Sequence, residues 1–475
     1  MAEKYDLVIL GAGTGGYVAA IRAAQLNLNV AVVEKGKLGG TCLHQGCIPS
    51  KALLRSAEVF KTVKQADTFG VETKETALNF PKVMERKQQI VDQLYNGVQS
   101  LMKKGKIDVY HGLGRILGPS IFSPTPGTIS VEYEEEGREN DMLIPSNVIV
   151  ATGSRPRTLP GLELDETNIV SSNGALAMEE LPSSISIIGG GVIGVEWASM
   201  FADFGVKVNV FEYTDRLLPT EDKDISKEME KALAAKGVVI HTGAKVDASG
   251  VKTVGEGVIV PYTSDSGQAE VTTDKVLVSV GREPNVKNIG LENTDIIVEN
   301  GFIKVNKNYQ TKESHIYAVG DVIGGMQLAH VASHEGIAAV EHISGGNPHP
   351  VDPQMTARCT YSSPEAASVG MTEDEAAEKG YNVKIGKFPF QAVGKALVHG
   401  DTSGFVKFVT DQDTDDLLGV HMIGPHVTDM ISEAALAKLL DATHWEVASS
   451  IHPHPSLSEA IGEAALAVDG KQIHG

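Results

Sequence analysis

The stretch Tyr5-Asp6-Leu7-Val8-Ile9-Leu10-Gly11-Ala12-Gly13-Thr14-Gly15-Gly16 decides the fold of this 475-residue chain. The apolar run 5–10 predicts a buried parallel strand, residues 17–26 predict a helix, and a second strand over 30–33 ends at Glu34. This order is typical of a dinucleotide-binding unit. In such a unit Gly11 permits the tight turn, Gly13 lets the pyrophosphate approach the backbone, and Gly16 allows the helix to pack closely on the strand. We expect Glu34 to bind the ribose hydroxyls.

The same pattern recurs later in the chain. A strand over 185–188 leads into a second glycine motif with Gly189, Gly191 and Gly194, followed by a predicted helix over 195–204 and a strand that ends at Glu212. In both copies the acid lies 21 residues after the middle glycine. Two such units predict two bound dinucleotides. Glu212 favours NAD because it would repel a ribose 2′-phosphate, although the nearby Arg216 leaves NADP use open.

Cys42 and Cys47 are two of the three cysteines in the chain, and they lie five residues apart. Pro49 suits the first turn of a helix and residues 50–55 are good helix formers, so we expect Cys47 at a helix N-terminus. The helix dipole and Lys51 would favour a thiolate there. A structural disulfide or metal ligation is disfavoured in a chain with so few cysteines. We therefore interpret the pair as a redox-active dithiol.

The composition excludes several classes of function. A formal net charge of −20 argues against binding to nucleic acids or anionic membranes, which need clustered Lys and Arg, and favours a basic partner. No apolar run approaches membrane-spanning length, and the N-terminus has no signal-sequence pattern. We expect a soluble, cytoplasmic protein.

Residues 39–51, Gly-Gly-Thr-Cys-Leu-His-Gln-Gly-Cys-Ile-Pro-Ser-Lys, resemble the redox-disulfide signature of the flavin-dependent pyridine nucleotide-disulfide oxidoreductases. Their Ile-Pro-Ser-Lys ending is similar to that of the dihydrolipoamide dehydrogenases within this family. The resemblance implies FAD at the first dinucleotide unit and NAD at the second. It also implies that dihydrolipoyl groups on lipoyl domains are oxidised through Cys42 and Cys47 while NAD is reduced to NADH. The alternatives are another disulfide reductase of the same fold and a flavoprotein that serves only as a structural or sensing subunit.

The resemblance implies further cofactor contacts. Residues 316–321 resemble the second flavin motif of the family, in which an aspartate, here Asp321, binds the ribityl chain. Lys51 is expected to pair with Glu196 near the reactive edge of the flavin. The remaining implied contacts are Gly114 in a predicted glycine turn over 112–114, Thr152, Gly153 and Ala329 for FAD, and Val246 and Gly281 for NAD.

A candidate acid–base pair lies near the C-terminus, in Ile451-His452-Pro453-His454-Pro455-Ser456-Leu457-Ser458-Glu459. A dithiol substrate needs a neutral imidazole held by a carboxylate, and Glu459 is placed to orient His454. An isolated histidine here would more often be a surface or capping residue. In the family that this stretch resembles, the motif serves the disulfide of the other subunit, which implies a homodimer.

The resemblance implies an α/β fold with two Rossmann-like dinucleotide-binding domains and a C-terminal α+β interface domain. The predicted bounds are 1–149 for the FAD domain with the redox disulfide, 150–278 for the NAD domain, 279–348 for a central segment that completes the FAD domain, and 349–475 for the interface and dimerisation domain. Members of the family dock on the acyltransferase core of 2-oxo acid dehydrogenase complexes through a small basic subunit-binding domain. We expect such a partner here because the chain is acidic.

Overall fold

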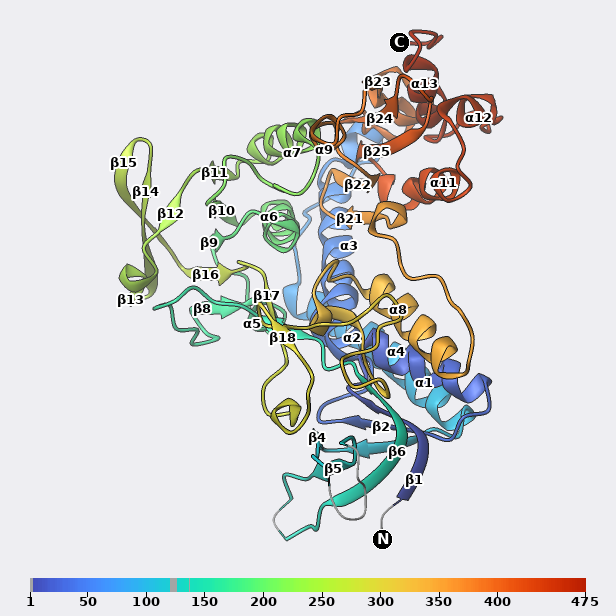
Figure 1. Ribbon diagram of the computed structural model, residues 1–475. Coiled ribbons are helices and arrows are strands. Elements are labelled where there is room, and N and C mark those ends of the chain that lie inside the picture. The colour runs from blue at the N-terminus through green and yellow to red at the C-terminus, as the bar shows by residue number, and fades with distance from the viewer. Residues whose placement is uncertain (1–2, 120–125, 136) are drawn as a thin grey trace. The chain divides into compact units, whose positions relative to one another are not determined.

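The computed structural model describes residues 3–119, 126–135 and 137–475 (Figure 1). These residues group into two compact units, each made of segments that are far apart in the sequence. Unit 1 consists of Met1–Ala52, Met84–Arg157 and Arg282–Val351. Unit 2 consists of Leu53–Val83, Thr158–Gly281 and Asp352–Gly475. The finer domain bounds expected from the sequence stay a prediction.

Unit 1 is built around a mostly parallel sheet (Figure 1). Its strands are β1 (Glu3–Leu10), β2 (Val30–Glu34), β3 (Asp108–His111), β4 (Leu113–Ile116), β5 (Ile129–Glu132), β6 (Asp141–Val150) and β20 (Ile316–Ala318). They run in the order β3-β2-β1-β6-β5-β4, and β20 also pairs with β6. β1 lies between two parallel neighbours, so Leu7, Val8 and Ile9 are fully buried. A continuous apolar run is what a strand covered on both faces requires.

The helices of unit 1 carry five of the predicted site residues, namely Gly16, Cys42, Cys47, Lys51 and Ala329. These helices are α1 (Thr14–Gln25), α2 (Gly40–Gln45) and α8 (Ala329–Ile343), together with parts of α3 (Cys47–Lys64) and α4 (Phe80–Lys104). α1 and α8 pack closely because Gly336 has no side chain: a Cβ there would lie 2.5 Å from the carbonyl oxygen of Gly15. Two short strands, β7 (Ser154–Pro156) and β17 (Arg282–Pro284), pair antiparallel.

Unit 2 contains a second parallel sheet, in the order β11-β10-β9-β16-β8. These strands are β8 (Ile169–Ser171), β9 (Ser184–Ile188), β10 (Lys207–Phe211), β11 (Val239–His241) and β16 (Lys275–Val278), accompanied by the helices α5 (Ser172–Ala175), α6 (Val192–Phe204) and α7 (Lys223–Ala235). Between β11 and β16 the chain forms an antiparallel sheet of β12 (Lys245–Val246), β13 (Lys252–Val254), β14 (Gly257–Ser264) and β15 (Gly267–Thr273).

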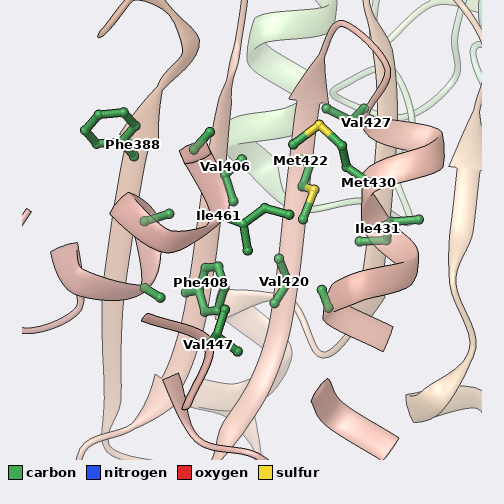
Figure 2. Packing of buried hydrophobic residues seen from close by; sticks show 14 of the residues in the cluster. Phe388, Val406, Phe408, Val420, Met422, Val427, Met430, Ile431, Val447 and Ile461 are labelled. Atoms are coloured by element: carbon green, nitrogen blue, oxygen red, sulfur yellow. The ribbon is translucent and has the colours of Figure 1, made fainter. Parts of the chain in front are cut away.

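The C-terminal part of unit 2 is an antiparallel sheet with helices. The sheet order is β21 (Arg358–Thr360), β22 (Glu365–Gly370), β25 (Leu417–Gly424), β24 (Phe405–Asp411) and β23 (Val383–Pro389), and the helices are α9 (Glu373–Glu378), α10 (Gly394–His399), α11 (Val427–Leu439), α12 (His444–Ser449) and α13 (Glu459–Ala467). Figure 2 shows the core that joins them, in which Phe408 and Val420 of the sheet lie beside Ile461 of α13, all fully buried. This core holds the start of α13, and therefore Glu459, in a defined place.

Both predicted strand–glycine–helix–strand units are present, each with its acid at or directly after the end of the second strand. Three local expectations were incomplete or wrong. Gly114 lies inside β4 and not in a turn over 112–114. The short helix α2, which carries Cys42, was not predicted, and neither was the antiparallel sheet over 245–273. Within the part of the chain that the structure describes, every helix is too short or too polar to cross a membrane.

Candidate active site

The first glycine motif is a turn that only glycine can make. Gly11 has φ +98°, and a Cβ on it would overlap the carbonyl oxygen of Ala151. A Cβ on Gly16 would overlap the carbonyl oxygen of Gly11. Gly13, the N-cap of α1, is different because the space around its Cα is open. The open face at a helix N-terminus suits a phosphate group, so this turn fits a dinucleotide.

The second motif repeats this geometry in unit 2. Gly189 has φ +109°, and a Cβ on it would overlap the carbonyl oxygen of Ser279. A Cβ on Gly194 would overlap the carbonyl oxygen of Gly189, whereas Gly191, the N-cap of α6, faces open space. The same reasoning therefore fits a second dinucleotide at the start of α6.

Glu34 and Glu212 close the two turns in the same way. Glu34 Oε2 accepts a hydrogen bond of 2.7 Å from the N–H of Ala12, and Oε1 accepts one of 2.7 Å from Gly36. Glu212 Oε2 accepts from the N–H of Gly190 at 2.6 Å, and Oε1 accepts from that of Thr214 at 2.8 Å. Each acid thus holds its glycine turn in place. A role in binding ribose, which we expected from the sequence, would have to use the remaining acceptor positions of these oxygens.

The cysteine segment is anchored to the first glycine motif. The N–H of Gly39 donates to the carbonyl of Ala12 at 2.7 Å. Gly40 has φ +57°, and a Cβ on it would lie only 2.6 Å from the Cα of Gly13. Cys42 follows in α2, and Cys47 is the first residue of α3, as predicted. The dithiol is therefore built directly onto the turn that fits a dinucleotide.

The two thiols differ in acidity. Both are half-buried thiols. The pKa of the Cys42 thiol is raised well above its usual range, first by its hydrogen bond to the Cys47 sulfur, then by burial and by the charge of Cys47, while Lys51 acts in the opposite direction. Cys42 therefore holds its proton strongly, whereas Cys47 lies at the positive end of α3, a position that favours a thiolate.

Asp321 lies in a partly buried polar cluster of unit 1. The hydroxyl of Ser154 donates to its carboxylate, and the guanidinium Nε of Arg282 lies 3.7 Å from the same oxygen. Arg282 also donates to the Ser154 hydroxyl at 2.7 Å. Burial lowers the pKa of Arg282, and the charges of Asp321 and Cys47 oppose this effect. Arg282 therefore connects Asp321 electrostatically to the dithiol.

The neighbouring predicted residues hold the same region together. The hydroxyl of Thr152 donates to the carbonyl of Asn285 at 2.8 Å, and the side chain of Asn285 donates back to the carbonyl of Thr152 at 2.9 Å. Gly153 accepts from the N–H of Asn285 at 2.9 Å. These bonds tie the end of β6 to the segment after β17. The other predicted residues are placed as follows: Gly114 against Leu10 and Val33, Ala329 at the start of α8, Val246 in β12, and Gly281 at φ +101° before β17.

Glu196 and Lys51 belong to different units. Glu196 is buried in α6, and its carboxylate accepts a hydrogen bond of 2.9 Å from the N–H of Tyr361 within unit 2. Lys51 lies in the part of α3 that belongs to unit 1. Their pairing stays a prediction.

His454 and Glu459 form the pair that the sequence suggests. The Nδ1 of His454 lies 2.8 Å from Oε1 of Glu459, and Glu459 Oε2 accepts from the N–H of Ser456 at 2.9 Å. Burial tends to raise the pKa of Glu459, but the bonds from Ser456 and His454 outweigh it and lower that pKa. A charged carboxylate thus holds one ring nitrogen, while the His454 side chain is 80% exposed. The geometry leaves Nε2 available for proton transfer with an incoming group.

Three functional candidates were missed by sequence reasoning: Ser154, Arg282 and Glu335. Ser154 and Arg282 meet Asp321 only through the pairing of β7 with β17. Glu335 is a buried acid in α8. An acid within the apolar pattern of residues 331–340 was a signal that could have identified it.

Two protein-family models match the chain. The model described as pyridine nucleotide-disulphide oxidoreductase matches residues 5–336, and that of the corresponding dimerisation domain matches residues 356–465. A dihydrolipoyl dehydrogenase of Bacillus subtilis (strain 168) is 69% identical to the chain over 474 residues, with 100% of both proteins covered. A dihydrolipoyl dehydrogenase of Zymomonas mobilis is 42% identical, also with 100% of both covered.

Two solved structures resemble the chain over almost its whole length. The crystal structure of LpdA from Mycobacterium tuberculosis has a TM-score of 0.89 at 26% identity, covering 98% of this chain and 99% of that one. The HOCl-induced flavoprotein disulfide reductase RclA from Escherichia coli, solved as a Cu(II) complex, has a TM-score of 0.86 at 28% identity, with 98% and 99% covered.

Replacement of Cys47 should lower the pKa of Cys42. In Cys47→Ala the hydrogen bond and charge that raise this pKa are gone, and the remaining rise from burial is opposed by Lys51, so alkylation of Cys42 by iodoacetamide near neutral pH should become faster by about tenfold or more. The measurement is the alkylation rate of Cys42 against pH, followed by mass spectrometry on reduced protein. Cys359→Ala is the control and should leave the profile unchanged. An unchanged profile in Cys47→Ala would mean that burial alone sets this pKa.

Proposed function

Because the chain belongs to the pyridine nucleotide-disulphide oxidoreductase family, in its dihydrolipoyl dehydrogenase branch, we propose that it oxidises protein-bound dihydrolipoyl groups and reduces NAD. It is an oxidoreductase that uses FAD and NAD. The observation that carries the proposal is the dithiol built onto the first glycine turn through Gly39 and Gly40. This contact brings the reactive sulfurs to the motif that we assign to FAD.

The sulfur chemistry follows from the acidity of the two thiols. In the oxidised enzyme Cys42 and Cys47 share a disulfide. His454, held by Glu459, takes a proton from a dihydrolipoyl thiol, and the resulting thiolate attacks the Cys42 sulfur. A mixed disulfide forms, the Cys42–Cys47 bond breaks, and Cys47 leaves as the thiolate that the start of α3 favours. The second lipoyl thiol then displaces Cys42 and closes the lipoyl disulfide, and the departing Cys42 sulfur takes up the proton that this thiol loses, so that the reduced dithiol is released with Cys42 protonated.

The cofactor sites complete the electron path. FAD, when bound, supplies a two-electron carrier between the dithiol and NAD. We assign FAD to the motif of Gly11, Gly13 and Gly16 and NAD to that of Gly189, Gly191 and Gly194. The other residues assigned to FAD are Glu34, Lys51, Gly114, Thr152, Gly153, Glu196, Asp321 and Ala329, and those assigned to NAD are Glu212, Val246 and Gly281.

The enzyme acts as a homodimer in this proposal. The match to the dimerisation-domain model over residues 356–465 supports the dimer, and this range contains both His454 and Glu459. We propose that the His454–Glu459 pair of one protomer serves the cysteines of its partner. The high exposure of the His454 side chain supports this, because the imidazole is free to enter a site formed by another chain.

The reaction itself is the first test. The holoenzyme should form NADH from dihydrolipoamide and NAD, and Cys42→Ser should abolish this activity because no disulfide can form. His454→Gln should lower the rate by about 10²–10⁴-fold through loss of the general base. His474→Gln is the matched control, since His474 also pairs with a glutamate, Glu463, at 2.6 Å but lies outside the motif.

Two other results of this assay would contradict parts of the proposal. Turnover of oxidised glutathione or another disulfide without activity on dihydrolipoamide would overturn the substrate and keep the reaction class. Equal losses in His454→Gln and His474→Gln would overturn the role of His454.

The two glycine motifs provide a reciprocal test of the cofactor assignment. A Cβ meets open space at Gly13 and at Gly191, so alanine there should spare the fold and hinder only the approach of a phosphate. Gly13→Ala should lose bound FAD while retaining affinity for NAD, and Gly191→Ala should raise the KM for NAD about tenfold, worth about 1.4 kcal/mol, with full FAD content. Flavin absorbance and NAD titration measure the two effects. If Gly191→Ala lost FAD and Gly13→Ala weakened the binding of NAD, the FAD and NAD assignments would have to be exchanged.

We further propose that the dimer docks on the small basic subunit-binding domain of a 2-oxo acid dehydrogenase acyltransferase. The net charge of −20 supports attraction to a basic surface. Retention of the enzyme on the immobilised acyltransferase should fall as the salt concentration rises, because salt screens exposed charges. Retention that does not change with salt would contradict electrostatic docking.

A further inference from the structure

Glu335 is a buried acid of unit 1 that the proposed chemistry does not use. It lies in the second turn of α8 and is only 7% exposed. Its Oε2 accepts a hydrogen bond of 2.7 Å from the backbone N–H of Gly320. None of the salt bridges among the described residues of unit 1 involves this carboxylate. A buried carboxylate with a neutral partner is expensive to keep charged.

The position of Glu335 connects it to the proposed FAD site from two sides. The adjacent Gly336 packs against Gly15 of the first glycine motif, where a Cβ would lie 2.5 Å from the Gly15 carbonyl oxygen. On the other side, Gly320 takes φ +76° and is followed by Asp321, the residue assigned to the ribityl chain. Glu335 therefore holds the turn that presents Asp321, and its helix lies against the turn that we assign to the diphosphate.

Glu335 and Asp321 differ in the partners of their carboxylates. Asp321 has a hydroxyl donor in Ser154 and a cation in Arg282 as partners, whereas Glu335 accepts its hydrogen bond from a backbone N–H. From the segment before β20, Tyr309 faces Glu335, and its hydroxyl accepts from the N–H of Val351 at 2.9 Å.

The remaining charged groups of the packed elements are already engaged elsewhere. Arg22 of α1 forms a salt bridge of 2.7 Å with Glu341. On α8 and β20, His342 bonds to Asn308 and Tyr317, and Nδ1 of His334 lies 2.8 Å from the carbonyl oxygen of His330. The further titratable side chains of α8 and α1 are those of His330 and Tyr17. Burial raises the pKa of Glu335 to about 7, the Gly320 N–H opposes this rise, and the charge of Asp321 adds to it.

We propose that Glu335 is a proton-linked positioning residue of the FAD site, which takes up one proton when the FAD diphosphate binds beside it. The diphosphate brings negative charge to the glycine motif and disfavours a second buried anion nearby. A protonated Glu335 still has an oxygen that accepts from Gly320, so the turn that carries Asp321 is kept. This inference rests on the proposed assignment of FAD to the first glycine motif.

The expected pH dependence follows from linkage. Because FAD binds best when Glu335 is protonated, its affinity is full below about pH 7 and falls as the pH rises above that value, by up to about tenfold per pH unit. Glutamine mimics the protonated acid, since it is neutral and offers a carbonyl oxygen to Gly320. Glu335→Gln should therefore retain FAD equally well at every pH in this range.

The test uses the holoenzyme. Samples are diluted to nanomolar concentration at pH values from about 6 to about 9, and released FAD is measured by its fluorescence. The wild type should release more FAD as the pH rises, whereas Glu335→Gln should release the same small amount of FAD at every pH. Glu341→Gln is the matched control, because Glu341 is an acid on the same helix that is paired with Arg22, and it should follow the wild type.

Each result separates the inference from the proposed function. A wild type whose FAD release does not change with pH overturns the inference even if Glu335→Gln fails to fold. The same slope in the wild type and in Glu335→Gln overturns it as well. A purified protein that contains no FAD overturns the proposed function first. Gly13→Ala that retains FAD while Gly191→Ala loses it overturns the assignment on which the inference rests.

Discussion

The close approach of backbone to backbone at two glycine turns is the constraint on which the rest of this structure depends. In each turn the third glycine faces the carbonyl oxygen of the first so closely that no side chain fits between them. This approach lets α1 and α6 start directly at the ends of β1 and β9 and leaves the middle glycine open. The helix N-terminus, its dipole and the open face together make a site for phosphate.

The acids of the site are stabilised by different means, and their chemistry differs accordingly. Glu34 and Glu212 accept two or more hydrogen bonds each, and these bonds hold the glycine turns in place. Glu459 is ionised by its bonds to Ser456 and His454 and orients an imidazole. Glu335, with a neutral partner, is the acid whose charge depends on its surroundings near neutral pH. The hydrogen-bond donors around each acid, rather than the residue type, therefore decide what that acid does.

The parts of the fold and site that follow from the sequence are those set by local chemistry. The glycine turns, the acid at the end of each second strand and Cys47 at the start of a helix depend on neighbours close in the chain, so Gly11, Gly189, Glu34 and Cys47 were predictable. The cluster of Ser154, Arg282 and Asp321 was not, because its members come from distant segments. Gly114 was misplaced in a turn because glycine is common in turns, whereas here it lets β4 pack on Leu10 and Val33.

The segmented construction of unit 1 sets an order of events during synthesis of the chain. β20 pairs in parallel with β6, with Ile316 opposite Val148, and α8 follows β20. A ribosome adds about 5–20 residues per second, so roughly ten to thirty seconds pass between the emergence of β6 and that of β20. Throughout this interval β6 lacks one neighbouring strand and α1 lacks its partner helix. The ribosome therefore makes the segment Thr158–Gly281 of unit 2 while the first nucleotide site is still incomplete, and during this period the exposed apolar surface of unit 1 most needs protection by molecular chaperones.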